Sequence, residues 1–513
     1  MQRDGACTSI WQSTLPDYTA RINYIPVNMQ DVVIVGGGIT GITTALLLQK
    51  AGKRVVVAEA HNIGFGTTGG TTAHLNTFMD SSYPQISKNF SFDDARLVAS
   101  AAKEAIDLVK QHIGEYKIDC SFKELPGYLF SINEKQTRDL DEIVEVSKKV
   151  GVMVDMINST VLPIPYLKIA LFENQAQFHP LQYLYALAKA FEEAGGILLQ
   201  HCRVLQATEN GSVEVITTKG NIRCRQLIYA THIPPGVNLL HFRCAPYRSY
   251  AIAVQLKNDD YPKAVVYDMN DPYHYYRTQE IEGQPYLVVG GEDHKTGHED
   301  NTEACFRRLE SHVRSFFDVQ AVHYKWSSQY FEPADGLPYI GHLPGHPDNI
   351  FVATGFGGNG MIYGTFAAIL LKDLLLNNKT PYDELFDPNR IKPVAGFANF
   401  VAEAADVVGT LASGIFPAKK LAVVADLAPE EARIVDFEGK KMGIYKDKQG
   451  RLHAISPACT HIKCLVQWNT AEKTWDCPCH GSRFSYTGEV LTGPARKSLA
   501  VFDLKSEELT IHR

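Results

Sequence analysis

The sequence predicts an α/β protein that is followed by a small all-β domain. Three observations predict it. A strand, a glycine turn and a helix follow one another within residues 31–60, strand-like segments recur between residues 213 and 291, and the chain after about residue 421 consists of short strands and turns. A length of 513 residues implies roughly two to four domains. Hydrophobic residues make up 45% and charged residues 21%, which excludes disorder, a collagen-like repeat and a coiled-coil rod.

Charge and hydropathy exclude several partners. The formal net charge is −7 and no basic stretch is present, so nucleic acid is not expected as a partner. No apolar run reaches the roughly 18–20 residues of a membrane helix, so no transmembrane segment is expected. The first residues, MQRDGACTSIWQSTLPDY, contain no apolar core like that of a signal peptide. We therefore expect a cytoplasmic protein.

The elements follow in order along the chain. Residues 31–60 predict a buried strand, a helix and a second buried strand, which is typical of a parallel sheet. Helical patterns cover 91–115, 131–150 and 181–194, strands are expected at 213–220, 222–230, 250–256 and 286–291, and a strand, turn and helix at 349–376. Residues 388–420 predict a linker with one helix, so we expect domains at 1–387 and 421–513.

The glycine turn predicts a dinucleotide site. Gly36-Gly37-Gly38-Ile39-Thr40-Gly41 fits G-x-G-x-x-G, directly after a strand and at the start of a helix. Its glycines permit a tight turn, the approach of a pyrophosphate, and close packing of helix on strand. Glu59 ends the next strand, about twenty residues further on, where a carboxylate binds ribose hydroxyls. This pattern predicts a Rossmann-like fold and leaves FAD and NAD open.

Further segments favour FAD through resemblance to a family. AHNIGFGTTGGTTAHL (60–75), and PADGLPYIG (333–341) with ATGFGGNGM (353–361), resemble glycine-rich segments of the D-amino-acid oxidase/glycine oxidase superfamily. LIYATHIPP (227–235) and VVGGEDHKTG (288–297) look like a subgroup with an additional iron–sulfur domain. The resemblance implies a Rossmann-like FAD-binding domain with an inserted antiparallel-sheet substrate domain. It assigns FAD binding to Gly36, Gly38, Ile39, Thr40, Gly41, Glu59, Ala60, Thr67, Thr68, Val204, Gly355, Gly360 and Met361.

Three positions depart from that family. Tyr330 stands where glycine oxidases carry an arginine for the substrate carboxylate, which argues against a simple α-amino acid as substrate. Val288 stands where sarcosine oxidases carry an oxygen-activating lysine, which argues against direct use of oxygen. Gly70 stands where some relatives attach FAD through a histidine, so we expect non-covalent FAD.

Two cysteine–histidine segments predict a metal centre. Cys459-Thr460-His461-Ile462-Lys463-Cys464 and Cys477-Pro478-Cys479-His480-Gly481-Ser482 each supply one Cys and one His, the ligand set of a Rieske [2Fe–2S] cluster. Two Cys and two His also suit tetrahedral zinc, but fifteen residues between His461 and Cys477 do not match zinc-finger spacing. We predict iron ligation by Cys459, His461, Cys477 and His480.

The same segments resemble the Rieske proteins of cytochrome bc complexes. The resemblance implies a disulfide between Cys464 and Cys479, a covering loop at 493–495 (GPA), and a Ser482 hydroxyl bonded to a cluster sulfide. Phe484 replaces the tyrosine of that family, and the loss of one donor to the cluster should lower its reduction potential.

Together these features predict an FAD-dependent oxidoreductase of the dehydrogenase type. It would oxidise a small amine or N-substituted compound at a C–N bond and pass electrons from FAD to the cluster and on to an external partner protein. Candidates for the flavin-facing pocket are Tyr275, Tyr276, Arg277, His294 and Tyr330, and no catalytic base is assigned. The alternative is an electron-transfer or redox-sensing module without its own small-molecule substrate.

Overall fold

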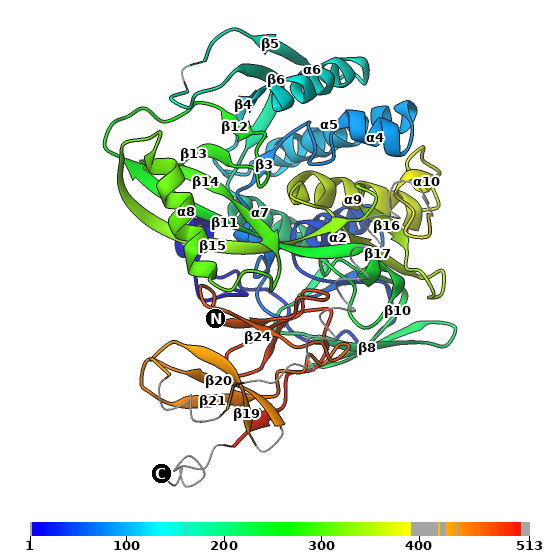
Figure 1. Ribbon diagram of the computed structural model, residues 1–513. Coiled ribbons are helices and arrows are strands. Elements are labelled where there is room, and N and C mark those ends of the chain that lie inside the picture. The colour runs from blue at the N-terminus through cyan, green and yellow to red at the C-terminus, as the bar shows by residue number, and fades with distance from the viewer. Residues whose placement is uncertain (1–2, 161, 391–418, 421–426, 438–439, 504–513) are drawn as a thin grey trace, which may run out of the picture.

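The computed structural model describes residues 3–160, 162–390, 419–420, 427–437 and 440–503 (Figure 1). It confirms the predicted fold class, with mixed α/β sheets followed by a small antiparallel β region. The linker helix expected within 388–420 falls almost wholly outside the described residues. No helix of the described part of the chain is long and apolar enough to cross a membrane.

The first sheet carries the predicted dinucleotide turn. Strands β17, β10, β1, β2 and β7 run parallel. Their near-continuous apolar sequences are typical of a parallel sheet that is buried on both faces. Antiparallel β16 extends one edge, and the hairpin of β8 and β9 pairs with β10. The strands are β1 (Gln30–Val35), β2 (Val55–Ala58), β7 (Ile197–Leu199), β8 (Val204–Glu209), β9 (Val213–Thr217), β10 (Gly220–Tyr229), β16 (Tyr339–His342) and β17 (Ile350–Thr354).

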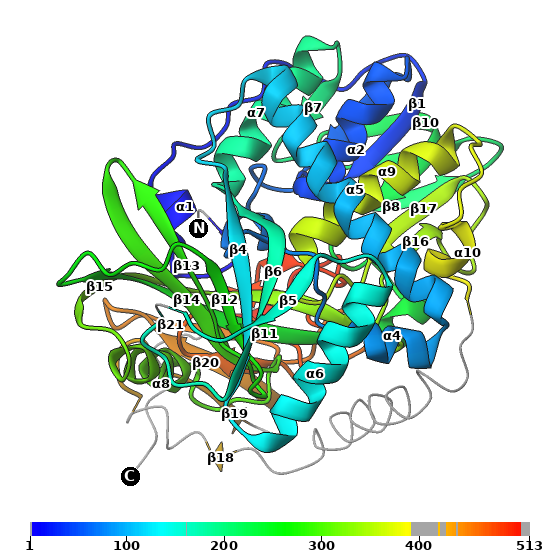
Figure 2. The same cartoon turned by 90° about the horizontal axis from the view of Figure 1, so that it is seen from above.

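Long helices lie together beside this sheet, with α2 against α7 and α9, and α9 against α5 (Figure 2). Their ends follow from local sequence: the Ser91 side chain caps α5 by accepting from Asp94 N–H, and left-handed Lys117 ends it. The helices are α2 (Ile39–Lys50), α5 (Phe92–Tyr116), α7 (Pro180–Glu193) and α9 (Gly360–Leu375), with the shorter α1 (Ile10–Ser13), α3 (Thr67–Gly70), α4 (Tyr83–Asn89) and α10 (Asp383–Phe386).

The second sheet is largely antiparallel, in the order β15-β11-β14-β13-β12-β4-β6-β3, with β5 paired to β6. Helix α8 (Thr302–Arg314) packs on β11 and β14, and α6 (Glu134–Lys149) packs near β4 and β5. The strands are β3 (His74–Leu75), β4 (Lys123–Ser131), β5 (Val154–Ile157), β6 (Lys168–Gln177), β11 (Cys244–Leu256), β12 (Val265–Asp268), β13 (Tyr275–Ile281), β14 (Gln284–Lys295) and β15 (Val319–Pro333).

The structure shifts several predicted boundaries, and the strand expected at 250–256 begins at Cys244. The helix expected at 131–150 begins at Glu134, after Asn133, whose side chain accepts from Gln136 N–H. Residue 131 ends strand β4, which the sequence pattern did not reveal. Pro126 interrupts the pattern there, and the register of β4 on β6 shifts between Leu125 and Gly127, as in a β-bulge.

The C-terminal β domain consists of two small sheets. They contain β18 (Lys419–Lys420), β19 (Ala432–Phe437), β20 (Lys440–Lys446), β21 (Leu452–Ile455) and β26 (Val501–Phe502), and β22 (Gln467–Asn469), β23 (Thr474–Asp476), β24 (Arg483–Ser485) and β25 (Val490–Thr492). One hydrophobic core of this domain includes Cys459, Cys464, Cys477 and Cys479 together with Trp475.

A buried group of charges joins this domain to the rest of the protein. Three arginines and three carboxylates contribute, each with a side chain at most 5% exposed, and we call them the charge cluster: Arg3, Asp4, Arg248, Glu472, Asp476 and Arg483.

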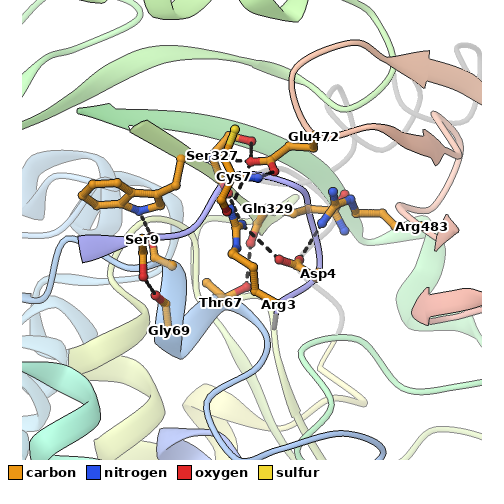
Figure 3. A network of polar contacts seen from close by, with 12 residues as sticks. Arg3, Asp4, Cys7, Ser9, Thr67, Gly69, Ser327, Gln329, Glu472 and Arg483 are labelled. Atoms are coloured by element: carbon orange, nitrogen blue, oxygen red, sulfur yellow. Dashed lines mark hydrogen bonds and ion pairs between the residues drawn. The ribbon is translucent and has the colours of Figure 1, made fainter. Parts of the chain in front are cut away.

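The charge cluster connects three parts of the chain. Figure 3 shows Arg3 and Asp4, from the N-terminal segment, between the β15 residue Ser327 and the C-terminal β domain. Arg3 pairs with Glu472 at 3.1 Å, and Arg483 pairs with Asp4 at 2.5 Å. Glu472 also accepts from the backbone N–H of Ser327 at 2.8 Å. Burial alone would raise the pKa of Glu472, but Arg3 and its neighbouring arginines lower it, so the carboxylate remains ionised.

The first prediction concerns this cluster. Glu472→Gln should lower the free energy of unfolding by about 3 kcal/mol, because Arg3 would remain buried without its countercharge. Denaturant unfolding of the full chain measures this loss. Glu145→Gln is the matched control, since the pair of Glu145 with Lys149 is exposed and should contribute about 0.5 kcal/mol or less. Equal stability of E472Q and the wild type would show that the cluster does not fasten the domains.

Candidate functional site

A cavity of about 300 Å³ has walls from all three parts of the fold. One wall is formed by residues 35–40 and 58–61 of the first sheet, and another by 249–251, Tyr273, Tyr275, Trp326 and 328–331 around the second sheet. Residues 491–493, Ala495 and Arg496 of the C-terminal β domain also line it. The cavity therefore combines the predicted dinucleotide turn with residues of the second sheet and of the C-terminal β domain.

The glycine turn has the geometry of a phosphate cradle. Gly36 has φ +113°, and a Cβ there would lie 2.4 Å from the carbonyl oxygen of Ala230. A Cβ on Gly41 would lie 1.9 Å from the carbonyl oxygen of Gly36, so only glycine lets α2 begin this close to the turn. The free N–H groups and positive dipole end of α2 therefore face a space that suits a pyrophosphate.

Glu59 lies next to this turn. Its carboxylate accepts from the N–H of Gly37 at 2.7 Å and from the N–H of His61 at 2.8 Å. Burial raises the pKa of Glu59, while these hydrogen bonds and Arg203 oppose the increase. A carboxylate held rigidly beside the cradle is suited to accept hydrogen bonds from ribose hydroxyls.

Most residues assigned to the dinucleotide line the cavity. They are Gly36, Gly38, Ile39, Thr40, Glu59, Ala60, Thr67, Thr68, Val204, Gly360 and Met361. Gly41 and Gly355 are not among the lining residues. Gly41 serves the packing of α2 on the turn, whereas Gly355, with φ +75°, turns the chain against Cys244 and Pro333. Contact of Gly355 with the dinucleotide stays a prediction.

Two of the five pocket candidates line the cavity, Tyr275 and Tyr330. The Tyr330 hydroxyl donates to Asp293 Oδ2 at 2.9 Å, and the Tyr275 hydroxyl lies 2.9 Å from Ser249 Oγ. Trp326 and Ala251 form part of the adjacent sheet face.

The other three candidates, Tyr276, Arg277 and His294, are not among the residues that line the cavity. Side chains alternate along a strand, so Tyr276 points away from Tyr275 and its hydroxyl bonds His312 of α8. The His294 ring bonds the Tyr250 hydroxyl at 2.9 Å. Arg277 is fully buried against backbone carbonyls, among them that of Ala73 at 2.8 Å.

Val288 is a buried residue on β14, opposite Ala253 and Arg277. It is not among the lining residues, so at this position the side chain presents no charge to the cavity. Gly70 lines the cavity, and a Cβ there would lie 2.9 Å from Ser328 Oγ, so little space exists for a larger side chain.

The predicted metal ligands lie together in the C-terminal β domain. The thiols of Cys459 and Cys477 are buried and within hydrogen-bonding contact of one another. The rings of His461 and His480 lie 5.0 Å apart and nearly perpendicular. Nδ1 of each ring is buried and bonds no atom of the described residues, as expected for atoms that ligate a metal. Burial lowers the pKa of His480 to about 3, which keeps the imidazole in its neutral, ligating form.

Neighbouring residues support these two loops. A disulfide joins Cys464 to Cys479 and so connects the loops. Ser482 Oγ accepts from the N–H of Ala495 at 2.9 Å, which attaches the 493–495 loop to the second ligand loop. Phe484 is fully buried in the same hydrophobic core as the four cysteines. These residues therefore surround a site of the ligand composition that a Rieske cluster requires.

The histidine side of this site packs on the flavin-side loop 231–242. His461 Nε2 lies 3.0 Å from the carbonyl oxygen of Gly236, and the His241 ring lies 4.8 Å from the His461 ring. Phe242 contacts His480 with centroids 5.6 Å apart. Ligation of a metal through Nδ1 of His461 would leave the proton on Nε2, which would then donate to the Gly236 carbonyl oxygen.

The same loop also lines the cavity. Thr231, His232, Ile233 and Pro235 belong to the cavity wall, only a few residues before the contacts with the cluster ligands. The Arg496 guanidinium donates to the carbonyl oxygen of Pro235 at 2.9 Å, and Gly236 N–H donates to the carbonyl oxygen of Pro494 at 3.0 Å. One short segment therefore separates the predicted dinucleotide site from the predicted cluster.

Sequence reasoning missed several residues of the site. Asp80 and Asp293 line the cavity, as do Tyr267, Tyr273 and Arg496. Asp293 lies within the VVGGEDHKTG segment, so that segment could have pointed to it. Asp80 has no motif around it that could have done so.

Comparison with known proteins agrees with this geometry. The family model named FAD dependent oxidoreductase (DAO) matches residues 31–374, and the Rieske [2Fe-2S] domain model matches residues 418–503. These matches confirm the predicted cofactors, FAD and a [2Fe–2S] cluster.

One relative is similar over most of the chain, and two others are similar over about 70% of it. The chain is 36% identical over 477 residues to YhfW of Bacillus subtilis (strain 168), whose name calls it a Rieske 2Fe-2S iron-sulfur protein, covering 92% of this chain and 93% of YhfW. It is 27% identical over 371 residues to gamma-glutamylputrescine oxidoreductase of Escherichia coli (strain K12), covering 69% and 85%. Glycine oxidase from Geobacillus kaustophilus aligns with a TM-score of 0.60 and 19% identity, covering 71% and 100%, which shows the shared fold.

The second prediction concerns the metal centre. Purified protein should contain iron, absorb light as a flavoprotein, and give a Rieske-type electron paramagnetic resonance (EPR) signal after reduction. Metal analysis together with EPR spectroscopy checks this. One zinc ion per chain without iron would contradict the assignment of Cys459, His461, Cys477 and His480.

The third prediction concerns Phe484. Phe484→Tyr should raise the reduction potential of the cluster, because a hydroxyl donated to a cluster sulfur stabilises the added electron. A redox titration followed by EPR measures the midpoint. Phe502→Tyr is the control, since Phe502 packs in the other small core of the domain and should not change the midpoint. An unchanged midpoint in F484Y would show that the ring does not face the cluster.

Proposed function

We propose that this chain, which belongs to the FAD dependent oxidoreductase (DAO) family and carries a C-terminal Rieske [2Fe-2S] domain, is an amine dehydrogenase in the broad sense. It oxidises a small amine or N-substituted compound at a C–N bond, and electrons pass from FAD to the Rieske cluster and on to an external acceptor. The matched relative gamma-glutamylputrescine oxidoreductase supports an amine-type substrate.

When bound, FAD accepts two electrons as a hydride and releases them singly, and the cluster accepts single electrons. The residues of the chain bind the cofactor and orient the substrate. The glycine turn and Glu59 hold the dinucleotide, and the described wall formed by β11, β13 and β15 positions the substrate. Oxidation of the amine removes a hydride from carbon and a proton from nitrogen, and the C–N single bond becomes C=N.

One observation carries the electron path. Thr231, His232, Ile233 and Pro235 line the cavity, and the Gly236 carbonyl oxygen accepts a hydrogen bond from His461 at 3.0 Å. A continuous piece of backbone thus links the flavin site to a ligand of the cluster. This arrangement supports electron transfer within one chain, and it favours an enzyme over a module without its own substrate.

The assignment of residues is part of the proposal. We propose that Cys459 and Cys477 ligate one iron, that His461 and His480 ligate the other, and that FAD is non-covalent. The flavin domain would span residues 1–387 and the Rieske domain residues 421–513, joined by 388–420. The family matches to 31–374 and 418–503 and the position of the N-terminal segment in the charge cluster support these bounds.

The fourth prediction tests the function. Under anaerobic conditions one or more small amines or N-methyl compounds should bleach the flavin absorbance and produce the EPR signal of the reduced cluster. In contrast, α-amino acids should reduce the flavin poorly, because Tyr330 replaces the arginine that binds their carboxylate. A protein that stays oxidised with every amine tested would favour the module without its own substrate.

Cluster-free protein provides the decisive control. His461→Ala combined with His480→Ala should remove the cluster while the flavin site remains. Turnover with an artificial one-electron dye should then persist, and turnover with oxygen should remain slow, because Val288 offers no positive charge to a developing superoxide anion. Production of hydrogen peroxide by this variant as fast as intact protein consumes substrate would show an oxidase instead.

A further inference from the structure

The cavity contains an acidic group with an unused hydrogen-bond acceptor. Asp293, on β14, lines the cavity, and its Oδ2 accepts from the Tyr330 hydroxyl at 2.9 Å. Its Oδ1 is buried and has no hydrogen-bond partner among the described residues. A buried carboxylate oxygen without a donor is unfavourable unless a ligand supplies one.

A second unpaired polar group lies in the same cavity. The Tyr267 side chain lines it, is 7% exposed overall, and its hydroxyl has no hydrogen-bond partner among the described residues. Tyr275 lies 6.5 Å from Tyr267 and 5.6 Å from Tyr273, measured between ring centroids. With Tyr330, these phenol rings form an aromatic wall whose faces attract a cation.

Asp80 is the second carboxylate of the cavity. It is fixed to the glycine loop before α9, because its Oδ2 accepts from Gly358 N–H at 2.6 Å and its own N–H donates to Asn359 at 2.8 Å. Its side chain is open to the cavity. The negative charge of Asp80 disfavours ionisation of Asp293.

The arginine side chains that line the described part of the cavity are already hydrogen-bonded to other groups. Arg203 bonds His61 at 2.8 Å and the Val490 carbonyl oxygen at 3.0 Å, beside Glu59. Arg496 bonds the carbonyl oxygen of Pro235. His74 and His232 also line the cavity, and burial lowers the pKa of His74 to about 3 and that of His232 to about 4, so both are neutral.

We propose that the cavity binds its substrate as an organic ammonium ion, with Asp293 as the primary counter-ion, Asp80 as a second carboxylate, and Tyr267, Tyr273, Tyr275 and Tyr330 as the surrounding aromatic wall. The proposal rests on the proposed function, since it names the substrate class of the same site. An N–H of the ammonium supplies the donor that Asp293 Oδ1 lacks. Tyr330 stands where glycine oxidases carry an arginine for a substrate carboxylate, and it orients the carboxylate of Asp293 instead. The site therefore selects a cation rather than an anion.

Binding should depend on pH. Burial raises the pKa of Asp293 to about 7, and repulsion from Asp80 adds to the increase, whereas the hydrogen bond from Tyr330 opposes it. Loss of contact with bulk water inside the cavity likewise raises the pKa of Asp80 to about 6. The other charged neighbours are Glu332, whose Oε1 lies 3.4 Å from the Tyr330 hydroxyl, and His274, whose pKa is raised to about 9 by Asp268 and Glu292 despite burial. Because carboxylates are charged above their pKa, cation binding should strengthen as the pH rises from 6 to 8.

A non-oxidisable probe separates binding from turnover. tert-Butylammonium carries three N–H donors but no hydrogen on the carbon next to nitrogen, so it cannot be oxidised to an imine. Its binding to oxidised holoenzyme can be followed by calorimetry and by the flavin spectrum. We expect saturable binding that strengthens with pH, much weaker binding of the isosteric neutral tert-butanol, and no binding of the anion pivalate, which carries the same tert-butyl group.

Variants assign the binding to the named carboxylate. Asp293→Asn should weaken tert-butylammonium binding by about tenfold or more and remove most of its pH dependence, because a charge-assisted hydrogen bond is lost. Asp259→Asn, an exposed substitution outside the cavity, should leave binding unchanged. Circular dichroism and FAD content verify that D293N is folded, and Tyr330→Phe gives a second variant, for which a smaller loss is expected.

The outcomes distinguish this inference from the proposed function. Binding of the cation that D293N weakens, without reduction by any amine, would support the cation site and contradict the amine dehydrogenase. Reduction by amines with equal affinity for cation, alcohol and anion, or with D293N equal to wild type, would overturn the cation site and leave the dehydrogenase standing.

Discussion

The buried charge cluster is the constraint on which the arrangement of the two redox sites depends. Its three arginines and three carboxylates come from the N-terminal segment, from β11 and from the Rieske domain. Each charge is removed from water, and this cost is offset only when all three parts meet. Any other docking position would leave charges such as Arg3 or Glu472 buried and unpaired, or would return them to water with loss of the packed interface. We infer that the cluster specifies one position of the Rieske domain on the flavin domain.

That position directs the histidine side of the cluster site to the flavin domain. His461 donates to Gly236, and His241 and Phe242 cover the rings of His461 and His480. The residues just before Gly236 form part of the cavity wall. A fixed, short connection of this kind suits repeated single-electron transfer, because the Rieske domain would not have to be repositioned between transfers. The cavity itself combines a rigid dinucleotide turn with an acidic, aromatic region around Asp293.

The sequence revealed the features that are local. The glycine turn at 36–41 and the Cys–His segments at 459–482 each lie within a short stretch, and the chemistry of each requires those residue types at that spacing. The sequence did not reveal the positions of side chains that depend on the pairing of strands in a sheet. Tyr275 and Tyr276 are neighbours in sequence, yet alternation along β13 places only Tyr275 in the cavity. Arg277 is polar in sequence but is used within the fold to bind backbone carbonyls. The charge cluster joins Arg3 to Glu472, a separation that no sequence pattern could indicate.

The most direct test of the central claim, transfer of electrons within one chain through a fixed contact, is the concentration dependence of cluster reduction. Oxidised holoenzyme is mixed anaerobically with a saturating amine substrate in a stopped-flow instrument, and the cluster is followed by its absorbance or by freeze-quench EPR spectroscopy. The account predicts that the cluster is reduced with a first-order rate constant that does not change when the protein concentration is varied tenfold. A rate that rises in proportion to protein concentration would show that electrons pass between molecules, and would contradict the account.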